Sequence, residues 1–324
     1  MKKWYFTGMA AIIGMAALFV SACSTEAALQ GLFGTGAVSP VFYGVKTPAE
    51  GEVEFLFSGE VKVSSLYFDP PLETEVVSQG EKVAVRFRST LPGGTKIAAD
   101  ILVEDKHKNT LNVMVSFRTR NDRMPELLIN EVRAAYSKPK AEFVEIVTLK
   151  AGNLGGMCLF AAYESEEPIF EFPPVEVKKG EYIVVHTRSI EEGLVDETGT
   201  NLAQSRGTDA SPTARDFWVP GTQILHSTNA IYLTDQDGKI LNGVTLFGQK
   251  SKWTERVAAA AQLMAEQKAW KGANPEDAAN SDGNTATRTI CRAAGTNTNS
   301  AANWYITATS GATPGGANNP KRYQ

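Results

Sequence analysis

Apolar and polar residues alternate in short runs through residues 41–120, and turn residues separate the runs. The runs are EVEFLFSG, VKVSSLYF, TEVVS, KVAVRFRS, TKIAADILVED and TLNVMVSFRT, with breaks such as PAEG, DPPLE, QGE, LPGG and KHKN between them. A period of two is typical of strands that bury one face. Six or seven such strands at a spacing of roughly ten residues predict a β-sandwich over residues 41–120.

Alternation also predicts a pair of strands in ELLINEVRAAYSKPKAEFVEIVTLK, residues 126–150, which carries Glu131, Glu142 and Glu145 among apolar residues. Carboxylates gathered on one face can perform acid/base chemistry or hold a hard cation. Carboxylates on strand faces can also simply bond nearby backbone, Arg or Lys. Neighbouring side chains of a regular strand point to opposite faces, so the spacing alone does not bring the three glutamates together. Both interpretations stay open at this point.

A polar segment, residues 189–223, departs from the strand pattern and ends in the aromatic pair Phe217 and Trp218. Loops on a rigid scaffold often carry binding surfaces. The two rings therefore either dock a partner or cover the core of the domain.

A second segment, residues 251–284, is rich in Ala, Gln, Glu, Lys, Leu and Met, which favour helix. Its large apolar residues follow an approximate helical spacing and are Trp253, Val257, Ala260, Met264 and Trp270, with Gly272 and Pro275 as stop signals. The pattern predicts one amphipathic helix, which either packs against its own sheet or docks a partner through residues such as Trp253 and Trp270.

The first 22 residues have the features of an export signal. Two lysines precede an apolar run, residues 9–20, that is too short to span a membrane. The run leads into Val20-Ser21-Ala22-Cys23, which resembles a bacterial lipobox. The resemblance implies cleavage before Cys23 and lipidation of that residue, followed by a small, Gly-dotted tether over residues 23–40. We therefore expect a lipid-anchored envelope protein whose first partner is the membrane, at the outer membrane or cell surface rather than the inner membrane.

Charge and cysteine content limit the partners further. Removal of residues 1–22, which hold two lysines and no acids, changes the net charge from −4 to about −6. This acidic balance argues against nucleic acid as a partner. After Cys23, only Cys158 and Cys291 remain. A pair of cysteines in an exported chain permits a disulfide, but the sequence does not show whether the two sulfur atoms meet.

The motifs of residues 127–319 occur in an order that resembles the lamin-tail domain, an Ig-like β-sandwich. They are INEV (129–132), EFVEI (142–146), LGGMCL (154–159), FP (172–173), GEYIVV (180–185), LTDQDG (233–238), RTICR (288–292), Trp304 and PGGAN (314–318). Two features depart from the family: Met157 and Cys158 replace the usual tryptophan, and residues 189–223 and 251–284 are insertions. Residues 41–120 resemble, more loosely, the Ig-like modules of bacterial surface proteins, and residues 121–126 are the expected hinge.

The lamin-tail resemblance implies two Ig-like sandwiches in tandem, all-β apart from the helical insertion, with Glu131, Glu142 and Glu145 in structural roles. His107, His186 and His226 lie far apart and match no zinc spacing, and no hydrolase or nucleotide-binding motif appears. TDQDGKI, residues 234–240, lacks the later EF-hand ligands and predicts a hairpin. We therefore expect no catalysis, no cofactor and no metal.

The expected function is binding or scaffolding of protein or glycan partners, with Phe217, Trp218, Trp253 and Trp270 as candidate contacts. The alternative is an accessory role in an exported hydrolase system of the nuclease type, because bacterial lamin-tail domains are often fused to such enzymes. A purely architectural role is the third possibility.

Overall fold

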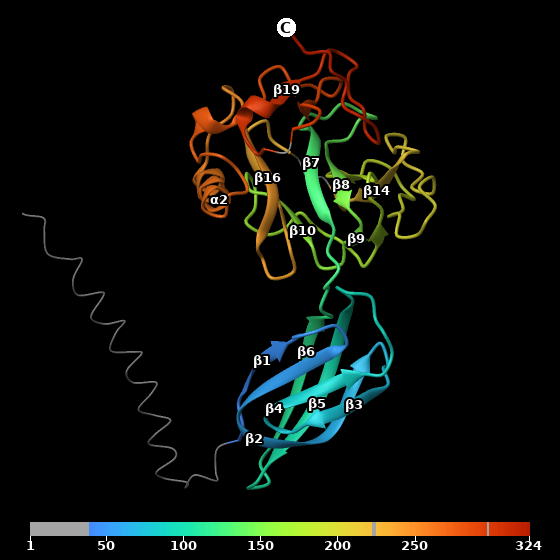
Figure 1. The fold of residues 1–324 in the computed structure, drawn as a ribbon, viewed down its shortest axis with the longest axis vertical. Coiled ribbons are helices and arrows are strands. Elements are labelled where there is room, and N and C mark those ends of the chain that lie inside the picture. Colours follow the sequence, from blue (N-terminus) through green and yellow to red (C-terminus); the bar gives the residue numbers. More distant parts are fainter. Residues whose placement is uncertain (1–38, 222–224, 297) are drawn as a thin grey trace, which may run out of the picture. The chain divides into compact units, whose positions relative to one another are not determined.

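The computed structural model describes residues 39–221, 225–296 and 298–324, which divide into two compact units (Figure 1). The first unit reaches Thr90 and resumes over Lys96–Phe117; the second comprises Leu91–Thr95 and Arg118–Gln324. The expected signal peptide, Cys23 and nearly all of the expected tether lie outside the described residues. With 42% strand and 6% helix, the chain is predominantly β, as the alternation predicts.

The first unit consists of six strands in one sheet, in the order β3-β4-β2-β5-β6, with β1 pairing to β2 (Figure 1). The strands are β1 (Phe42–Lys46), β2 (Glu52–Asp69), β3 (Thr74–Ser78), β4 (Gly80–Phe87), β5 (Lys96–Asp105) and β6 (Thr110–Arg118). The predicted strands of this region are therefore present, but they pair in one sheet and not in the two sheets of the predicted sandwich. A second difference concerns β2.

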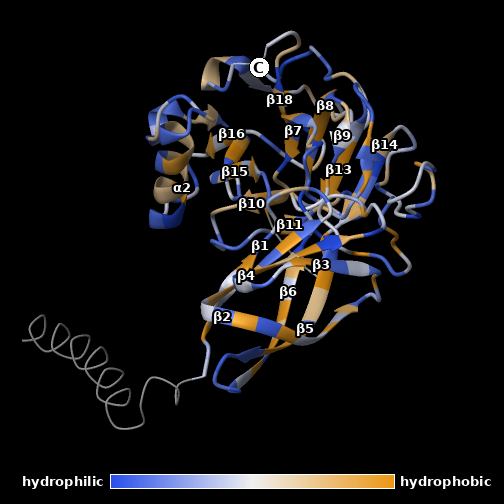
Figure 2. Cartoon of the chain, turned by 60° about the horizontal axis from the view of Figure 1, so that its bottom comes forward, coloured by the Kyte–Doolittle hydropathy of each residue, from blue (hydrophilic) through white to orange (hydrophobic). Residues whose placement is uncertain are grey.

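Strand β2 is continuous over 18 residues where the pattern predicts two strands. Its first part pairs with β1 and β4, and after a register shift between Leu56 and Val61 its last part pairs with β5. Bulges bend a strand and increase its twist, so one strand can serve both parts of a curved sheet. Polar and apolar residues alternate along it (Figure 2), and Val53 and Phe55 are fully buried in the core of the unit.

The second unit contains two large sheets and a small one. Their orders are β14-β13-β8-β7-β18-β19, β11-β10-β15-β16-β17 and β12-β9. The strands are β7 (Glu126–Arg133), β8 (Phe143–Lys150), β9 (Gly152–Asn153), β10 (Cys158–Ala161), β11 (Phe170–Glu171), β12 (Glu176–Val177), β13 (Tyr182–His186), β14 (Ala214–Trp218), β15 (Asn229–Thr234), β16 (Ile240–Phe247), β17 (Ala279–Asn280), β18 (Ile290–Arg292) and β19 (Trp304–Ile306).

One hydrophobic cluster joins the two large sheets of this unit. Ile146 and Ile183 enter it from the six-stranded sheet, and Leu159 and Leu233 enter it from the five-stranded sheet. Side chains that interdigitate between two sheet faces are the core of a sandwich. The antiparallel pairs β7–β8 and β15–β16 confirm the two hairpins that the sequence predicts.

Helix α2 (Glu255–Glu266) lies in the segment where the composition predicts a helix. Thr254 caps it, because its hydroxyl oxygen accepts a hydrogen bond from the backbone N–H of Val257. Val257, Ala260 and Met264 belong to the core cluster, so the apolar stripe packs against its own unit. Two short 3-10 helices follow, η1 (Pro275–Asp277) and η2 (Ala301–Asn303).

In the described part of the chain, no helix combines the length and the apolar character needed to cross a membrane.

Two local features differ from the expectations. Ala214–Trp218, within the expected loop, forms strand β14 and pairs in parallel with β13. A parallel pair needs a long crossover and leaves no turn signal in the sequence. In the expected hinge, Asn121 is buried, and its side-chain amide donates hydrogen bonds to the carbonyl oxygens of Asn153 and Gly155. Asn121 is therefore held within the second unit, and the units divide next to Phe117 instead.

Candidate functional site

Two of the three predicted glutamates, Glu131 and Glu145, lie directly opposite each other in the β7–β8 pair. A register shift between Ile129 and Glu131 produces this arrangement. Ile129 and Val132 both enter the core cluster, three positions apart, so the alternation of β7 is reset between them. A bulge moves the residues that follow it to the opposite face. Regular alternation therefore could not have predicted the pair.

Glu131 and Glu145 are fully buried, and their carboxylates hold the segment near the C-terminus. The backbone N–H of Thr313 donates to Glu131 Oε1 and Oε2 at 3.3 and 3.2 Å, and its hydroxyl donates to Oε2 at 3.2 Å. The backbone N–H of Gly315 donates to Glu145 Oε2 at 2.7 Å, and the side-chain amide of Asn130 donates to Oε1 at 2.7 Å. All four carboxylate oxygens are thus engaged by the protein itself.

Burial shifts the titration of both groups. Loss of solvent raises the pKa of Glu131, and it raises the pKa of Glu145 well above its usual range, with the charge of Glu131 as the second cause. The hydrogen bonds from Asn130, Thr313 and Gly315 act in the opposite direction. The pair therefore retains a proton at a higher pH than two exposed glutamates do.

We call residues 313–318 the C-terminal strap. Its other contacts also tie it to the second unit: Asn318 Nδ2 donates to the backbone oxygens of Asn130 and Arg292 at 3.1 and 2.8 Å. The hydroxyl of Ser211 donates to the carbonyl oxygen of Pro314 at 3.0 Å. The buried glutamates therefore anchor a chain segment, which favours the structural interpretation over acid/base chemistry.

Glu142 lies apart from this pair and is also buried. Its two oxygens accept hydrogen bonds from Arg188 Nε and Nη2 at 2.8 and 2.9 Å, a bidentate ion pair. Within the described residues, no group of three or more His, Cys, Asp or Glu side chains is arranged to hold a metal ion.

Cys158 and Cys291 are both free thiols. Cys158 lies in β10 and Cys291 in β18, strands of two different sheets, and the disulfide that the sequence left open is not formed. Burial is the main cause that raises the pKa of Cys158 to about 11 and the pKa of Cys291 still higher. Reactivity belongs to the thiolate, so both groups are poor nucleophiles near neutral pH.

The aromatic pair considered for partner binding belongs to the interior. Phe217 is fully buried in the core cluster, and Trp218 is 6% exposed. The indole N–H of Trp218 donates to Ser205 Oγ at 2.6 Å, and its ring stacks on His186 with the centroids 3.8 Å apart. His186 Nε2 lies 2.7 Å from Asp216 Oδ1. The structure therefore decides between the two alternatives for these rings: they cover the core.

The aromatic residues around helix α2 are likewise occupied. Trp270 is 2% exposed, and its indole N–H donates to the carbonyl oxygen of Asp277 at 3.1 Å. Trp253 is partly buried against the core cluster and meets Phe247 edge to face. Trp270 is therefore closed to a partner, and Trp253 is partly covered by the core cluster.

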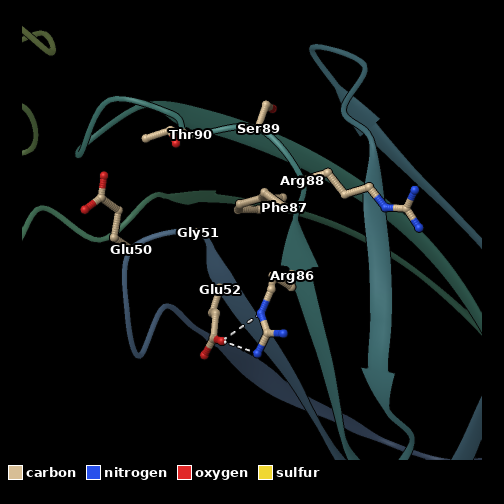
Figure 3. A pocket seen from close by; sticks show the side chains of 8 residues that line it. All are labelled: Glu50, Gly51, Glu52, Arg86, Phe87, Arg88, Ser89 and Thr90. Carbon is tan, nitrogen blue, oxygen red and sulfur yellow. Dashed lines mark hydrogen bonds and ion pairs between the residues drawn. The ribbon is translucent and has the colours of Figure 1, made fainter.

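The first unit carries two surface grooves that the sequence analysis did not single out. The Glu52–Arg86 groove, about 320 Å³, lies between the β1–β2 turn and the segment after β4 (Figure 3). Glu52 Oε1 accepts hydrogen bonds from Arg86 Nε and Nη2 at 3.2 and 2.9 Å, while Arg88 extends away from this pair. With Glu50 included, the lining holds two acidic and two basic side chains, so it has no preference for either ligand charge.

The Tyr67–Met114 groove, also about 320 Å³, lies over β2, β5 and β6. Tyr67 is 68% exposed and Met114 is 81% exposed, and both line it. Asp69 and Asp100 are its acidic residues, and its lining contains no basic side chain. Exposed aromatic and methionine side chains are typical of interaction surfaces.

A signal for this groove exists in the sequence. In LYFD, residues 66–69, Phe68 is in phase with the apolar core positions, which leaves the tyrosine on the solvent side of the strand. A large apolar residue at a solvent-facing strand position is the observation that would have identified it.

The sequence model of a family, TP_1001_2nd, described as a protein second domain, matches residues 125–306. An uncharacterized protein of Treponema pallidum (strain Nichols) is 29% identical over 203 residues, which cover 58% of this chain and 50% of the relative. The chain thus spans about half the length of that relative. Among solved structures, the N-terminal part of the bacterial S-layer protein SbsC matches with 15% identity and a TM-score of 0.22, over 50% of this chain and 43% of that chain. So low a TM-score carries no argument about fold or function.

Proposed function

The chain belongs to the TP_1001_2nd family through its second unit, and on that premise we propose that it is a non-catalytic, lipid-anchored protein of the cell envelope that binds a protein partner. In this proposal Cys23 carries the lipid and the acyl chains hold the protein at the membrane. In this proposal the second unit is a lamin-tail-like sandwich, and the first is an Ig-like module whose six strands pair in one curved sheet. The motif order of residues 127–319 and the shared core of the two large sheets support that assignment.

The observation that carries the binding function is the Tyr67–Met114 groove. The four aromatic residues first considered for binding are engaged in the second unit, whereas Tyr67 and Met114 are exposed side chains that line one surface depression. Tyr supplies a rigid contact with little conformational entropy to lose, and Met adapts its shape to a partner. Both residue types are enriched at protein–protein interfaces.

The buried carboxylates of the second unit have a structural role. Its buried carboxylates are bonded to the C-terminal strap and to Arg188. Residues used in this way stabilise the fold of the second unit itself. We therefore assign the contact surface to the groove of the first unit.

Site-specific photocrosslinking in intact cells tests the binding function. A photoreactive phenylalanine analogue replaces Met114 in one variant and Tyr43, which is 70% exposed on β1 and outside the groove, in the matched control. We expect a discrete crosslinked protein from position 114 and none from position 43. Equal crosslinking from both positions, or none from position 114, would overturn the assignment of the surface.

The anchor is tested separately by labelling with fatty acid. Cys23→Ala removes the thiol that the lipid requires, so the variant is expected to accumulate as an uncleaved precursor that carries no lipid label. Incorporation of labelled fatty acid into the Cys23→Ala chain would contradict the anchor.

A further inference from the structure

We propose that the Tyr67–Met114 groove recognises a basic side chain, arginine or lysine, on the protein partner. This inference rests on the proposed function, because it names the chemistry of the partner at the same surface. Three properties of the groove lead to it: its shape, its charge and the exposed ring beside the charge.

The shape follows from the register of β2 and β5. Tyr67 lies opposite Asp100, and Asp69 lies opposite Ala98. A small alanine next to the large side chains of Tyr67 and Met114 leaves the depression of about 320 Å³. The lining therefore combines a carboxylate opposite an aromatic ring with a flexible thioether.

The charged side chains that line the groove are all acidic. Asp69 and Asp100 are the ionisable acids of the lining, and no Lys or Arg lines it. In the described part of the chain, neither aspartate takes part in any of the ion pairs that join other acidic side chains to Arg, Lys or His. The contrast with the Glu52–Arg86 groove is direct, since there the arginine is already paired with Glu52. A groove with two unpaired carboxylates is complementary to a cation.

The ring of Tyr67 and the thioether of Met114 favour a long basic side chain over other cations. A guanidinium or ammonium over the face of Tyr67 gains a cation–π contact while Asp100, opposite Tyr67, supplies the counter-charge. The aliphatic stem of Arg or Lys buries apolar surface while its head stays polar, so it can lie against Met114. A small inorganic cation would gain nothing from the ring or the thioether wall in this way.

An arginine peptide is the direct probe. The mature chain with Cys23→Ser is labelled with 13C at the methionine methyl groups, and the Met114 signal is assigned with Met114→Leu. Acetyl-Gly-Arg-Gly-amide is titrated against it, and the peptide with citrulline in place of arginine is the neutral control. We expect a saturable shift of the Met114 methyl signal and about two- to fivefold weaker binding of the citrulline peptide.

Substitutions inside and outside the groove test which side chains bind the peptide. Tyr67→Leu and Asp100→Asn are expected to weaken the arginine peptide by a similar two- to fivefold factor, and Tyr43→Leu is expected to leave it unchanged. The urea unfolding transition followed by far-UV circular dichroism reports whether each variant is folded. Equal binding of the arginine and citrulline peptides, no saturable shift, or equal loss in Tyr43→Leu would each overturn the inference, as would a neutral oligosaccharide that binds more tightly than the peptide.

The two experiments fail independently. If crosslinking from position 114 succeeds and the arginine peptide does not bind, the surface is an interface but its partner is not recognised through a basic side chain. If the peptide binds and no partner is crosslinked, the cation preference holds and the proposed function falls.

Discussion

Replacement of Gly315 by alanine tests whether the C-terminal strap is clamped to the buried glutamates. Gly315 has a φ of +83°, and an added Cβ would overlap Ser211 Oγ and lie 2.6 Å from Thr213 Oγ1. The left-handed conformation alone costs a non-glycine residue about 1–2 kcal/mol. The overlap adds a second cost, because the strap or the hydroxyls of Ser211 and Thr213 must move.

The size of the second cost follows from the hydrogen bonds that the movement breaks. The bond from Ser211 to Pro314 is an ordinary one, at about 0.5–1.5 kcal/mol. The bond from the Gly315 N–H ends on a carboxyl group and is worth about 1–3 kcal/mol. Together with the backbone cost, the expected loss of unfolding free energy is about 2.5–6.5 kcal/mol when both bonds are broken.

Gly180→Ala is the matched control. Gly180 has a φ of +81°, and nothing lies within 4 Å of an added Cβ. It therefore carries the backbone cost alone, about 1–2 kcal/mol.

Urea unfolding followed by tryptophan fluorescence measures both variants. The chain has five tryptophans; Trp4 lies in the expected signal peptide, and the other four lie in the second unit. Fluorescence of the mature chain thus reports the unit that holds the strap, without interference from the first unit. Equal destabilisation by Gly315→Ala and Gly180→Ala would refute the clamp.

Three further predictions concern the same unit. Glu145→Gln should flatten the pH dependence of stability. The pKa of Glu145 is raised in the folded protein, so its contribution to stability is fully present below pH 4.5 and is lost as the pH rises through the folded pKa. Urea titrations across this range check it, and an unchanged pH profile would argue against a buried proton. Cys158 and Cys291 should react slowly with a thiol reagent at pH 8 in the folded protein and rapidly in urea; two unreactive sulfurs in urea without reductant would indicate a disulfide instead. Phe217→Ala should lower the unfolding free energy by about 3–5 kcal/mol, because it empties a fully buried site, and a loss below ~1 kcal/mol would contradict that burial.

The sequence by itself determined the local architecture. Alternation predicts the strands of residues 41–120, the paired strands around Glu131 and Glu145, and the hairpin at Asp235–Gly238. Helix propensity with an apolar stripe predicts α2, and Thr254 provides its cap. These features depend on side chains a few residues apart, so the period of two or of 3.6 is enough to reveal them. The alternatives that it left open for Phe217 and Trp218 concerned exposure, which no local pattern measures.

The tertiary structure decided which residues meet. The bulge in β7 set Glu131 opposite Glu145, and a strap some 180 residues away in the chain supplied the N–H groups that their carboxylates accept. The parallel pairing of β14 with β13 buried Phe217 and Trp218, while the register of β2 with β5 put Tyr67 beside Asp100. Each of these contacts depends on a register or a crossover between strands, and a shift of a single residue would reverse the face of every side chain that follows. That is the physical reason why the pattern shows which positions alternate toward the core, whereas strand pairing decides which of the other side chains lie beside each other.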